Sequence, residues 1–349
     1  MKNLQVGNIK IGKNKCVIIA EAGVNHNCNL RMARRLIKEA KENGADIIKF
    51  QTYKADKLSV RNTPRFWNWD GELVKEGSQY DSYKRLDSFN EPEYKILVKL
   101  CKKSKIQFMS TPFDNEAVDM LDKLGVSAFK IASCDITNFP LLKKVAQKKK
   151  PIFLSTGASN LDEIKNALKF IMRYNKKICV MHCTLSYPTK PEDANLLALN
   201  QIQKNFKDIA LGLSDHTLGY KIAASSVLLG VRAIEKHYTY NKKLKKSADH
   251  WLSINSKELK MLREDVDLLI KASGDGKKRV LKSEVLTRKL ARRSLVAKYN
   301  IKKGQKITEK LLIPKRPGTG IPPYQINKIL GKKAKKNITK DSILRIRDF

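Results

Sequence analysis

Eight short runs of apolar and β-branched residues alternate with segments of helical periodicity, and this alternation constrains the fold more than any other feature of the chain. The runs begin at residues 16, 45, 107, 128, 151, 178, 209 and 232. Most of them are apolar along much of their length, as are parallel strands that are covered on both faces. Eight strand–helix repeats predict an α/β fold, a TIM (β/α)8 barrel, and an open doubly wound sheet is the alternative.

The intervening segments support the barrel. Apolar residues recur at helical spacing over residues 30–43, 91–105, 115–124, 161–174 and 257–271. Two of these segments end just before Gly44 and Gly125, where a glycine is suited to cap a helix C-terminus.

The character of the chain changes near residue 275, where Gly and Lys interrupt the helical pattern. The last 60 residues then mix short β-like pieces with Gly and Pro turns. We therefore predict a catalytic barrel over residues 1–275, a linker over 276–289 and a small β-rich domain over 290–349.

The connection between the second and third predicted strands, residues 53–90, is unusually long and is rich in aromatic residues, among them Trp67, Trp69, Tyr80 and Tyr83. Long loops in compact domains are often functional, so this segment is either a lid over the barrel mouth or a loop packed on the barrel side.

The chain of 349 residues has 71 Lys and Arg against 34 Asp and Glu, a formal net charge of +37. Nucleic-acid-binding proteins gather such charge in a patch or tail. Here lysine is spread over predicted helices and loops, so we expect a lysine-rich solvated surface and no nucleic-acid partner. The densest runs, residues 242–246 and 332–336, leave nucleic-acid binding open as the alternative.

Nothing near the N-terminus resembles the basic start and apolar core of a signal peptide, and no apolar run approaches the roughly 18 residues of a membrane span. The six cysteines include no CxxC pair, as expected for reduced thiols. We expect a cytoplasmic protein without a membrane partner.

Two lysines lie near the ends of otherwise apolar predicted strands, Lys49 in IIKFQT and Lys130 in AFKIAS. A buried ammonium group needs an anion. Hydroxyl residues end neighbouring strands, namely Thr111, Ser133, Ser155, Thr156 and Ser214. Because ammonium and hydroxyl groups suit phosphate and carboxylate oxygens, these residues predict an anionic substrate at the barrel mouth.

All five histidines fall at or just beyond predicted strand ends: His26, His182, His216, His237 and His250. The C-terminal strand ends of a parallel barrel surround one mouth, so we expect these side chains to face one cavity. His216 and His237 end consecutive strands, where two imidazoles predict a divalent metal site. We expect Mn2+, with Co2+, Mg2+ or Zn2+ as alternatives.

Carboxylates near the same mouth are candidates for proton transfer: Glu21 ends the first strand, Asp135 follows the fourth and Asp249 lies beyond the eighth. Asp215 alternates with His216, which predicts an outward, structural side chain. Glu235 shares the parity of His237 and should point inward.

Nine segments in order, with the C-terminal stretches RSLVAKYNIKKGQKIT and KRPGTGI, resemble the sialic acid (nonulosonate) synthase family, whose barrel is followed by an antifreeze-like (SAF) domain. The segments are EAGVNHN, KFQTYKAD, STPFD, KIASCDITNFPLL, LSTGAS, HCTLSYPTKPEDANL, GLSDHT, IEKH and ADHWLS. The match spans the whole chain. It implies condensation of phosphoenolpyruvate with an N-acetylated aminosugar.

The resemblance also implies roles for individual residues. Phosphoenolpyruvate would be held by Lys49, Thr111, Lys130, Ser133, Ser155 and Ser214, and the metal by His216 and His237. The sugar contacts map to Gln51, Asp135, Tyr187 and Asp249. Arg316 of the small domain would reach into a partner's barrel, which implies a domain-swapped homodimer. In this mechanism the metal polarises the sugar aldehyde, C3 of phosphoenolpyruvate attacks it, water captures the C2 cation, and phosphate leaves by C–O cleavage, with Glu21 handling protons.

The acceptor stays open at this point. We expect N-acetylmannosamine, which gives N-acetylneuraminate. The alternative is 2,4-diacetamido-2,4,6-trideoxymannose, because Asp135 stands where some members carry glutamate and Leu185 where some carry a polar residue. Two other hypotheses are an inactive basic protein that binds nucleic acid or glycan, and a synthase for phosphorylated sugars. The latter needs a second basic set, which the barrel motifs do not show.

Overall fold

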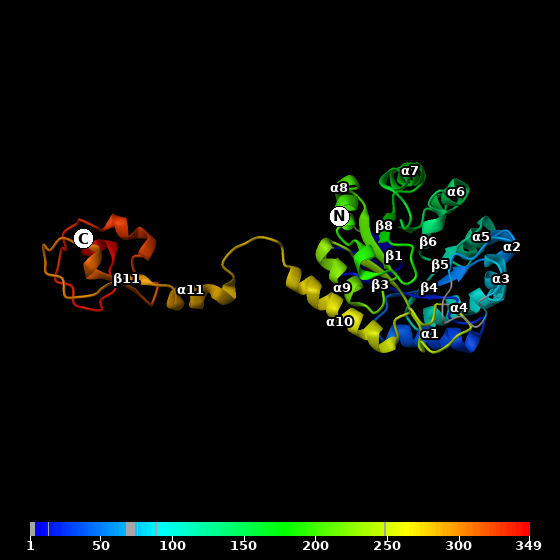
Figure 1. Cartoon of the computed structure of the whole chain (residues 1–349), viewed down its shortest axis with the longest axis horizontal. Helices are drawn as coiled ribbons and strands as arrows, with labels where there is room; N and C mark the ends of the chain where they lie inside the picture. Colours follow the sequence, from blue (N-terminus) through cyan, green and yellow to red (C-terminus); the bar gives the residue numbers. More distant parts are fainter. Residues whose placement is uncertain (1–3, 13, 68–73, 75, 88, 248) are drawn as a thin grey trace. The chain divides into compact units, whose positions relative to one another are not determined.

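The computed structural model describes residues 4–12, 14–67, 74, 76–87, 89–247 and 249–349. The chain divides into two compact units, Met1–Gly274 and Asp275–Phe349. Figure 1 shows the first unit as a barrel of strands surrounded by helices, and the second as a small unit that contains β11.

Eight parallel strands close the barrel in the order β10, β3, β4, β5, β6, β7, β8, β9. Their bounds are β3 (Val17–Gly23), β4 (Ile47–Thr52), β5 (Gln107–Pro112), β6 (Phe129–Ile131), β7 (Ile152–Ser155), β8 (Ile178–Cys183), β9 (Ala210–Asp215) and β10 (Ala233–His237). The last strand pairs with the first, with His237 opposite Glu21. This closure confirms the predicted TIM barrel and excludes the open sheet.

The helices cover the outside of the barrel (Figure 1). They are α1 (Leu30–Glu42), α4 (Glu91–Lys103), α5 (Asn115–Lys123), α6 (Phe139–Gln147), α7 (Leu161–Met172), α8 (Ala198–Asn205), α9 (Lys221–Ser225) and α10 (Ser256–Ser273). Gly44 and Gly125, which follow α1 and α5, have φ values of 93° and 76°. Residues other than glycine rarely adopt these left-handed φ values, which explains why glycine occupies both positions.

Strand parity separates two apolar layers. Outward residues such as Ile48 and Val180 belong to the large cluster beneath the helices. Inward residues such as Ile47 and Met109 form a second cluster inside the barrel, which also includes Ile11 of an N-terminal hairpin. The hairpin pairs β1 (Leu4–Val6) with β2 (Ile9–Ile11). The lower interior is thus apolar, and the polar inward residues lie toward the C-terminal strand ends.

The long connection after β4 contains two short helices, α2 (Ala55–Leu58) and α3 (Gln79–Lys84). The ring of Tyr83 lies 5.5 Å from that of Tyr53 and 5.9 Å from that of Trp67. Trp69 lies outside the described residues. Part of this connection therefore packs on its own aromatic side chains, and the lid stays a prediction.

The second unit has its own core, which includes Leu295, Ile307, Ile329 and Leu344. Its elements are η4 (Lys282–Glu284), α11 (Val285–Ala291), β11 (Ser294–Ala297), η5 (Glu309–Leu311), β12 (Leu312–Lys315), η6 (Pro323–Lys328) and η7 (Ile346–Asp348). Strands β11 and β12 pair antiparallel. The segment predicted as a linker, 276–289, includes η4 and part of α11.

All six cysteines are free thiols. Over the described ranges, no helix combines the length and apolar character needed to cross a membrane.

Candidate active site

Polar side chains of inward parity gather at the C-terminal ends of the barrel strands. In the strand register, Glu21 lies opposite both Lys49 and His237, and Glu235 lies opposite Ser214. The buried polar residues of inward parity in these strands are Glu21, Lys49, Thr111, Lys130, Ser155, Ser214, Glu235 and His237. The structure therefore brings together residues separated by more than 200 positions, as the barrel prediction required.

The centre of this group is a network of two lysines and two glutamates. Lys49 Nζ lies 2.8 Å from Glu21 Oε2 and 3.7 Å from Glu235 Oε2, and it donates to Thr111 Oγ1 at 3.0 Å. Lys130 Nζ lies 3.4 Å from Glu235 Oε1. Glu235 thus bridges both lysines, a role that its inward parity alone did not reveal.

Burial and charge act differently on the members of this network. Burial disfavours the charged form of Lys49, but Glu21 and Glu235 outweigh it and raise the pKa of the ammonium group. Burial likewise opposes ionisation of Glu235, yet Lys130 and Lys49 hold its pKa below the usual value. For Glu21, burial is the dominant effect and raises the carboxyl pKa despite Lys49. Glu21 is therefore the carboxyl of this network most suited to gain and lose a proton.

The predicted phosphate-binding hydroxyls lie at the same level. Ser214 Oγ donates to Glu235 Oε1 at 3.0 Å. Ser133, at the start of η1 (Ser133–Asp135), accepts from the Gly157 backbone N–H at 2.9 Å. Ser155 Oγ is buried without a hydrogen-bond partner among the described residues. A buried hydroxyl without a partner among the described residues, at the same end of the barrel as the two ammonium groups, fits an anionic ligand that completes its hydrogen bonding.

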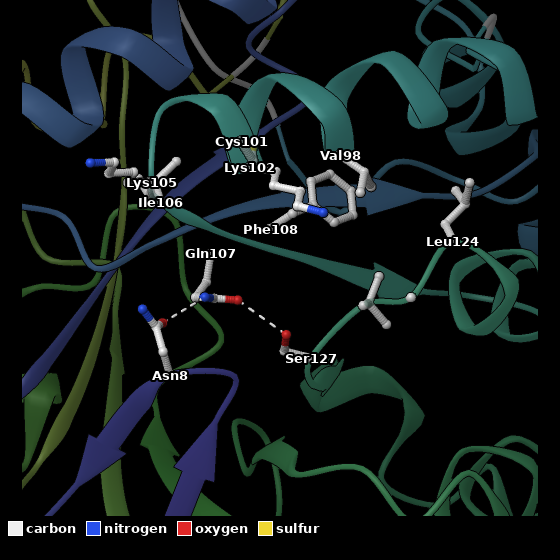
Figure 2. A pocket seen from close by; sticks show the side chains of 12 residues that line it. Asn8, Val98, Cys101, Lys102, Lys105, Ile106, Gln107, Phe108, Leu124 and Ser127 are labelled. Carbon is white, nitrogen blue, oxygen red and sulfur yellow. Dashed lines mark hydrogen bonds between the residues drawn. The ribbon is translucent and has the colours of Figure 1, made fainter.

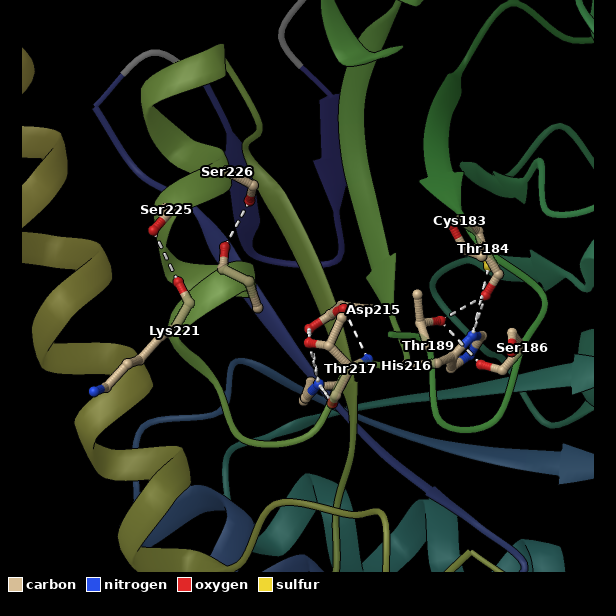
Figure 3. A network of polar contacts seen from close by, with 12 residues as sticks. Cys183, Thr184, Ser186, Thr189, Asp215, His216, Thr217, Lys221, Ser225 and Ser226 are labelled. Carbon is tan, nitrogen blue, oxygen red and sulfur yellow. Dashed lines mark hydrogen bonds and ion pairs between the residues drawn. The ribbon is translucent and has the colours of Figure 1, made fainter. Parts of the chain in front are cut away.

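His216 and His237 lie side by side, with ring centroids 5.4 Å apart. His216 Nδ1 lies 2.9 Å from the Thr184 carbonyl oxygen (Figure 3). If Nδ1 donates its proton there, Nε2 keeps the lone pair that a metal needs. Tyr187 lies against His216, 4.1 Å between ring centroids.

His237 fits a metal ligand by its protonation state. Burial, with the nearby His216 and Lys49, lowers its pKa well below 6.5, so the imidazole is neutral near pH 7. Its buried Nδ1 has no hydrogen-bond partner among the residues described, and the Asp249 carboxylate is 3.6 Å away. Within the same residues, no group of three or more His, Cys, Asp or Glu side chains is arranged to hold a metal ion. The two imidazoles thus suit a site that substrate or water would complete.

Three of the four predicted sugar contacts, Gln51, Tyr187 and Asp249, contact residues of this centre. Gln51 Nε2 donates to Glu21 Oε1 at 3.0 Å. The ring of Tyr187 packs against the rings of His216 and His237. Asp249 faces His237. Asp135 lies at the end of η1, where Asn138 donates to its carboxylate at 3.0 Å. Arg316 follows β12 in the second unit, is exposed, and its role toward a partner's barrel stays a prediction.

Asp249 gives a prediction for stability in the metal-free protein. Burial, then Glu21, raises its carboxyl pKa from 3.8 to about 7. The folded form holds a proton that the unfolded chain releases near pH 4, so this contribution to stability is complete below pH 4 and is lost as pH rises through 7. Asp249→Asn should therefore be more stable than wild type at pH 8 by up to about 4 kcal/mol, and about equally stable at pH 4. Urea unfolding at both pH values measures this, and an equal effect at both would contradict it.

The expectation that all five histidines face one cavity is wrong for three of them. His182 has outward parity on β8, and its Nε2 lies 2.9 Å from the Ala194 carbonyl. His26 stacks on Phe89 at 4.3 Å between ring centroids. His250 Nδ1 lies 2.8 Å from Thr239 Oγ1. A position at a strand end is therefore insufficient to predict that a histidine faces the cavity, because strand parity and the path of the following loop decide where the ring points.

A separate pocket of about 530 Å³ lies near the N-terminal end of β5 (Figure 2). Gln107, the first residue of that strand, donates to Asn8 Oδ1 at 2.8 Å and accepts from Ser127 Oγ at 3.1 Å. Thr111 lies four residues further along the same strand. The pocket is therefore at the opposite strand end from the polar network.

Comparison with known proteins decides the family. The NeuB family model matches residues 36–278. This chain belongs to the NeuB family. The SAF domain model matches residues 292–349, which confirms the predicted second domain type. The chain is thus a phosphoenolpyruvate-dependent nonulosonic acid synthase with a C-terminal SAF domain.

Three similar proteins illustrate this NeuB-family membership. The N,N'-diacetyllegionaminic acid synthase of Campylobacter jejuni is 41% identical, over 95% of this chain and 99% of its own. The protein of that name from Legionella pneumophila is 37% identical, over 94% and 93%. The crystal structure of N-acetylneuraminic acid synthetase from Leptospira borgpetersenii is 34% identical, with a TM-score of 0.73, over 82% of this chain and 95% of that one.

Proposed function

We propose that this synthase makes N,N'-diacetyllegionaminate by condensing phosphoenolpyruvate with 2,4-diacetamido-2,4,6-trideoxymannose and water. The observation that carries the proposal is that two relatives with this printed function align over 94% or more of the chain, at 41% and 37% identity. The comparisons therefore favour the alternative acceptor over N-acetylmannosamine, our first expectation. N-acetylneuraminate synthesis remains the second candidate, favoured by the similarity to the Leptospira enzyme.

Asp135 is the residue through which we infer the choice of acceptor. Its carboxylate is one methylene shorter than the glutamate of some family members. A shorter side chain leaves room for an acetamido group at C4, which the legionaminate precursor carries and N-acetylmannosamine lacks. The side-chain amide of Asn138, three residues after Asp135, donates to the Asp135 carboxylate at 3.0 Å and fixes the position of that carboxylate.

For phosphoenolpyruvate, we infer that Lys49 and Lys130 bind the phosphate and carboxylate oxygens. Both ammonium groups are buried and already paired with Glu235, at 3.7 and 3.4 Å. A buried cation is strongly attracted to a ligand anion because little water screens it. The Ser155 hydroxyl, which has no hydrogen-bond partner among the described residues, adds a donor.

His216 and His237 are the residues that would hold a divalent cation, for which Mn2+ is our first choice. Such a cation acts as a Lewis acid toward the acceptor aldehyde when bound. The chain's own contribution is to orient the His216 ring and to keep the His237 imidazole neutral. The Thr184 carbonyl oxygen contacts Nδ1 of His216, and burial lowers the pKa of His237.

The proposed reaction forms a C–C bond and a C–O bond to water, and it breaks the C–O bond to phosphate. The C–C bond joins C3 of phosphoenolpyruvate to the aldehyde carbon, whose oxygen takes up a proton. Water adds to C2 and loses a proton, and the C2–O bond to phosphate then breaks as the new hydroxyl becomes the C2 carbonyl and its proton passes to the departing phosphate, which keeps the bridging oxygen. We infer that Glu21 carries one of these protons, because burial raises its pKa and Gln51 orients its carboxyl group.

The acceptor experiment compares kcat/KM for the two sugars offered separately with phosphoenolpyruvate and Mn2+, with the products identified by mass. We expect the diacetamido sugar to be preferred by at least about tenfold, the effect of a group that fits one pocket and not another. Asp135→Glu should reduce that preference by filling the space, whereas Asp193→Glu, in η2 (Pro191–Ala194), should not. Preference of the wild type for N-acetylmannosamine would overturn the proposal and support the second candidate.

The homodimer and the contribution of Arg316 stay predictions of the family resemblance.

A further inference from the structure

A buried ion pair lies immediately before the two histidines on the opposite side of the same strands. Lys236 precedes His237 on β10, and Asp215 precedes His216 at the end of β9. Lys236 Nζ lies 2.7 Å from Asp215 Oδ2, with the two side chains only 1% and 4% exposed. The two residues are directly opposite each other in the strand register. The salt bridge therefore connects β9 to β10 at the level of the imidazoles.

Both members of the pair also hold the residue that follows His216. Asp215 Oδ1 accepts from the Thr217 backbone N–H at 3.0 Å, and Asp215 Oδ2 accepts from Thr217 Oγ1 at 2.9 Å. The Lys236 ammonium donates to the Thr217 carbonyl oxygen. Figure 3 shows these contacts of Asp215 and Thr217 next to His216. The backbone on both sides of His216 is thus tied to β10.

The opposite side of His216 is held by the loop after β8. The ring contacts the Thr184 carbonyl at 2.9 Å, and the His216 carbonyl oxygen accepts from the Thr189 backbone N–H at 3.0 Å. Because the ring and the main chain both have fixed partners, the remaining freedom of His216 relative to His237 is set by the β9–β10 connection. At this level the connection is the strand pairing of Asp215 with Lys236 together with the salt bridge between their side chains.

A charged pair in this position is not explained by stability. The outward residues that flank it along the strands, Leu213 and Ile234, belong to the apolar cluster beneath the helices. Burying two charges costs several kcal/mol per ion, and replacing a buried ion pair with apolar residues of similar volume often leaves the stability of the fold unchanged or raises it. The directional contacts of the pair, however, fix strand positions that apolar packing leaves adjustable.

We propose that Asp215 and Lys236 are positioning residues that fix the separation and orientation of the His216 and His237 imidazoles, and thereby set the affinity of this site for a divalent cation. The proposal rests on the metal-binding role proposed above for the two histidines. Partners that orient metal ligands typically contribute about 10- to 100-fold to metal affinity. The pair does not touch substrate, so its effect acts through the histidines.

The test measures the Kd for Mn2+ by electron paramagnetic resonance of the free ion, with full-length protein at pH 8 and no substrate. Asp215→Asn leaves Lys236 buried without a carboxylate. The double variant Asp215→Asn with Lys236→Met removes both charges, so it retains the fold without a lone buried charge. We expect both variants to raise the Kd by about tenfold or more.

A control uses a different ion pair, which is partly buried and lies at the far end of the barrel. Asp46 lies 3.2 Å from Arg263 and accepts from the Ile18 backbone N–H at 3.0 Å. Asp46→Asn should lower the unfolding temperature and leave the Kd for Mn2+ unchanged.

The outcomes separate the two proposals. If wild type binds Mn2+ and the double variant binds it equally well, the positioning role is overturned while the metal site stands. An equal loss of affinity in Asp46→Asn would also overturn it, because general destabilisation would then explain the effect. If wild type itself shows no Mn2+ binding, the metal site and the positioning role both fail.

Discussion

Replacing Lys49 with methionine is expected to lower kcat/KM for phosphoenolpyruvate by about 10³-fold, within the 2–5 kcal/mol typical of losing one partner of a buried charge pair. Lys49 is the ammonium group that contacts Glu21, Glu235 and Thr111 together. Methionine fills a similar volume without the charge. Steady-state kinetics of phosphate release at varied phosphoenolpyruvate measures the loss.

The fold of this variant should survive, with a smaller free energy of unfolding. Glu235 keeps Lys130 at 3.4 Å, and Glu21 can become neutral because burial already raises its pKa. The control is Lys57→Met on α2, which removes an ion pair with an exposed carboxylate, Glu116. Exposed pairs contribute little, so its kinetics should match wild type. Retention of more than a tenth of wild-type kcat/KM by Lys49→Met would contradict the anion-binding role.

The second large effect is expected for His237→Ala. The variant should lose measurable binding of Mn2+ and at least about 10³-fold of turnover, because one of only two proposed ligands is gone and metal catalysis provides several kcal/mol. Isothermal titration with Mn2+, alongside the phosphate-release assay, measures both quantities. The expectation depends on the neutral imidazole that burial creates at His237, whose Nδ1 has no hydrogen-bond partner among the described residues.

His182→Ala is the matched control for this experiment. His182 also lies at the end of a barrel strand, but its ring points outward and its Nε2 contacts the Ala194 carbonyl. The substitution removes one hydrogen bond, so a loss of about 1 kcal/mol in stability and no change in Mn2+ affinity are expected. Unchanged Mn2+ affinity in His237→Ala would refute the two-histidine site.

Much of the fold follows from the sequence because eight strands and their helices carry strong local patterns. Lys49 and Gln51, or Glu235 and His237, share inward parity at a spacing of two, so strand periodicity alone predicts a polar barrel mouth. The N-terminal hairpin is not predictable in this way, because strands of three residues carry almost no periodic signal. The resemblance, rather than periodicity, identifies the second domain as SAF.

The contacts within the site depend on the three-dimensional register. Glu235 reaches Lys130 across the barrel interior, from strands that are not neighbours in the sheet. Strand parity does not tell which inward side chains meet. The paths of His26 and His250 likewise depend on loops, where packing against Phe89 and a bond to Thr239 fix the rings. The outward parity of His182 also depends on the structure, because apolar residues occupy both faces of β8, with Val180 outward and Met181 inward.

The acceptor is the feature for which the sequence and the relatives favour different answers. The motifs around phosphoenolpyruvate are shared by synthases with different acceptors, so they do not distinguish them. The side chain of Asp135 is one methylene shorter than the glutamate of some members. A single difference of this size does not identify the acceptor when the rest of the chain resembles synthases with either acceptor.

The sharpest test of the proposed chemistry uses phosphoenolpyruvate labelled with 18O at the bridging oxygen, turned over with 2,4-diacetamido-2,4,6-trideoxymannose and Mn2+. Condensation with cleavage of the C2–O bond predicts one labelled phosphate for each nonulosonate formed. Phosphate without label, or no phosphate from folded protein with either acceptor, would contradict it.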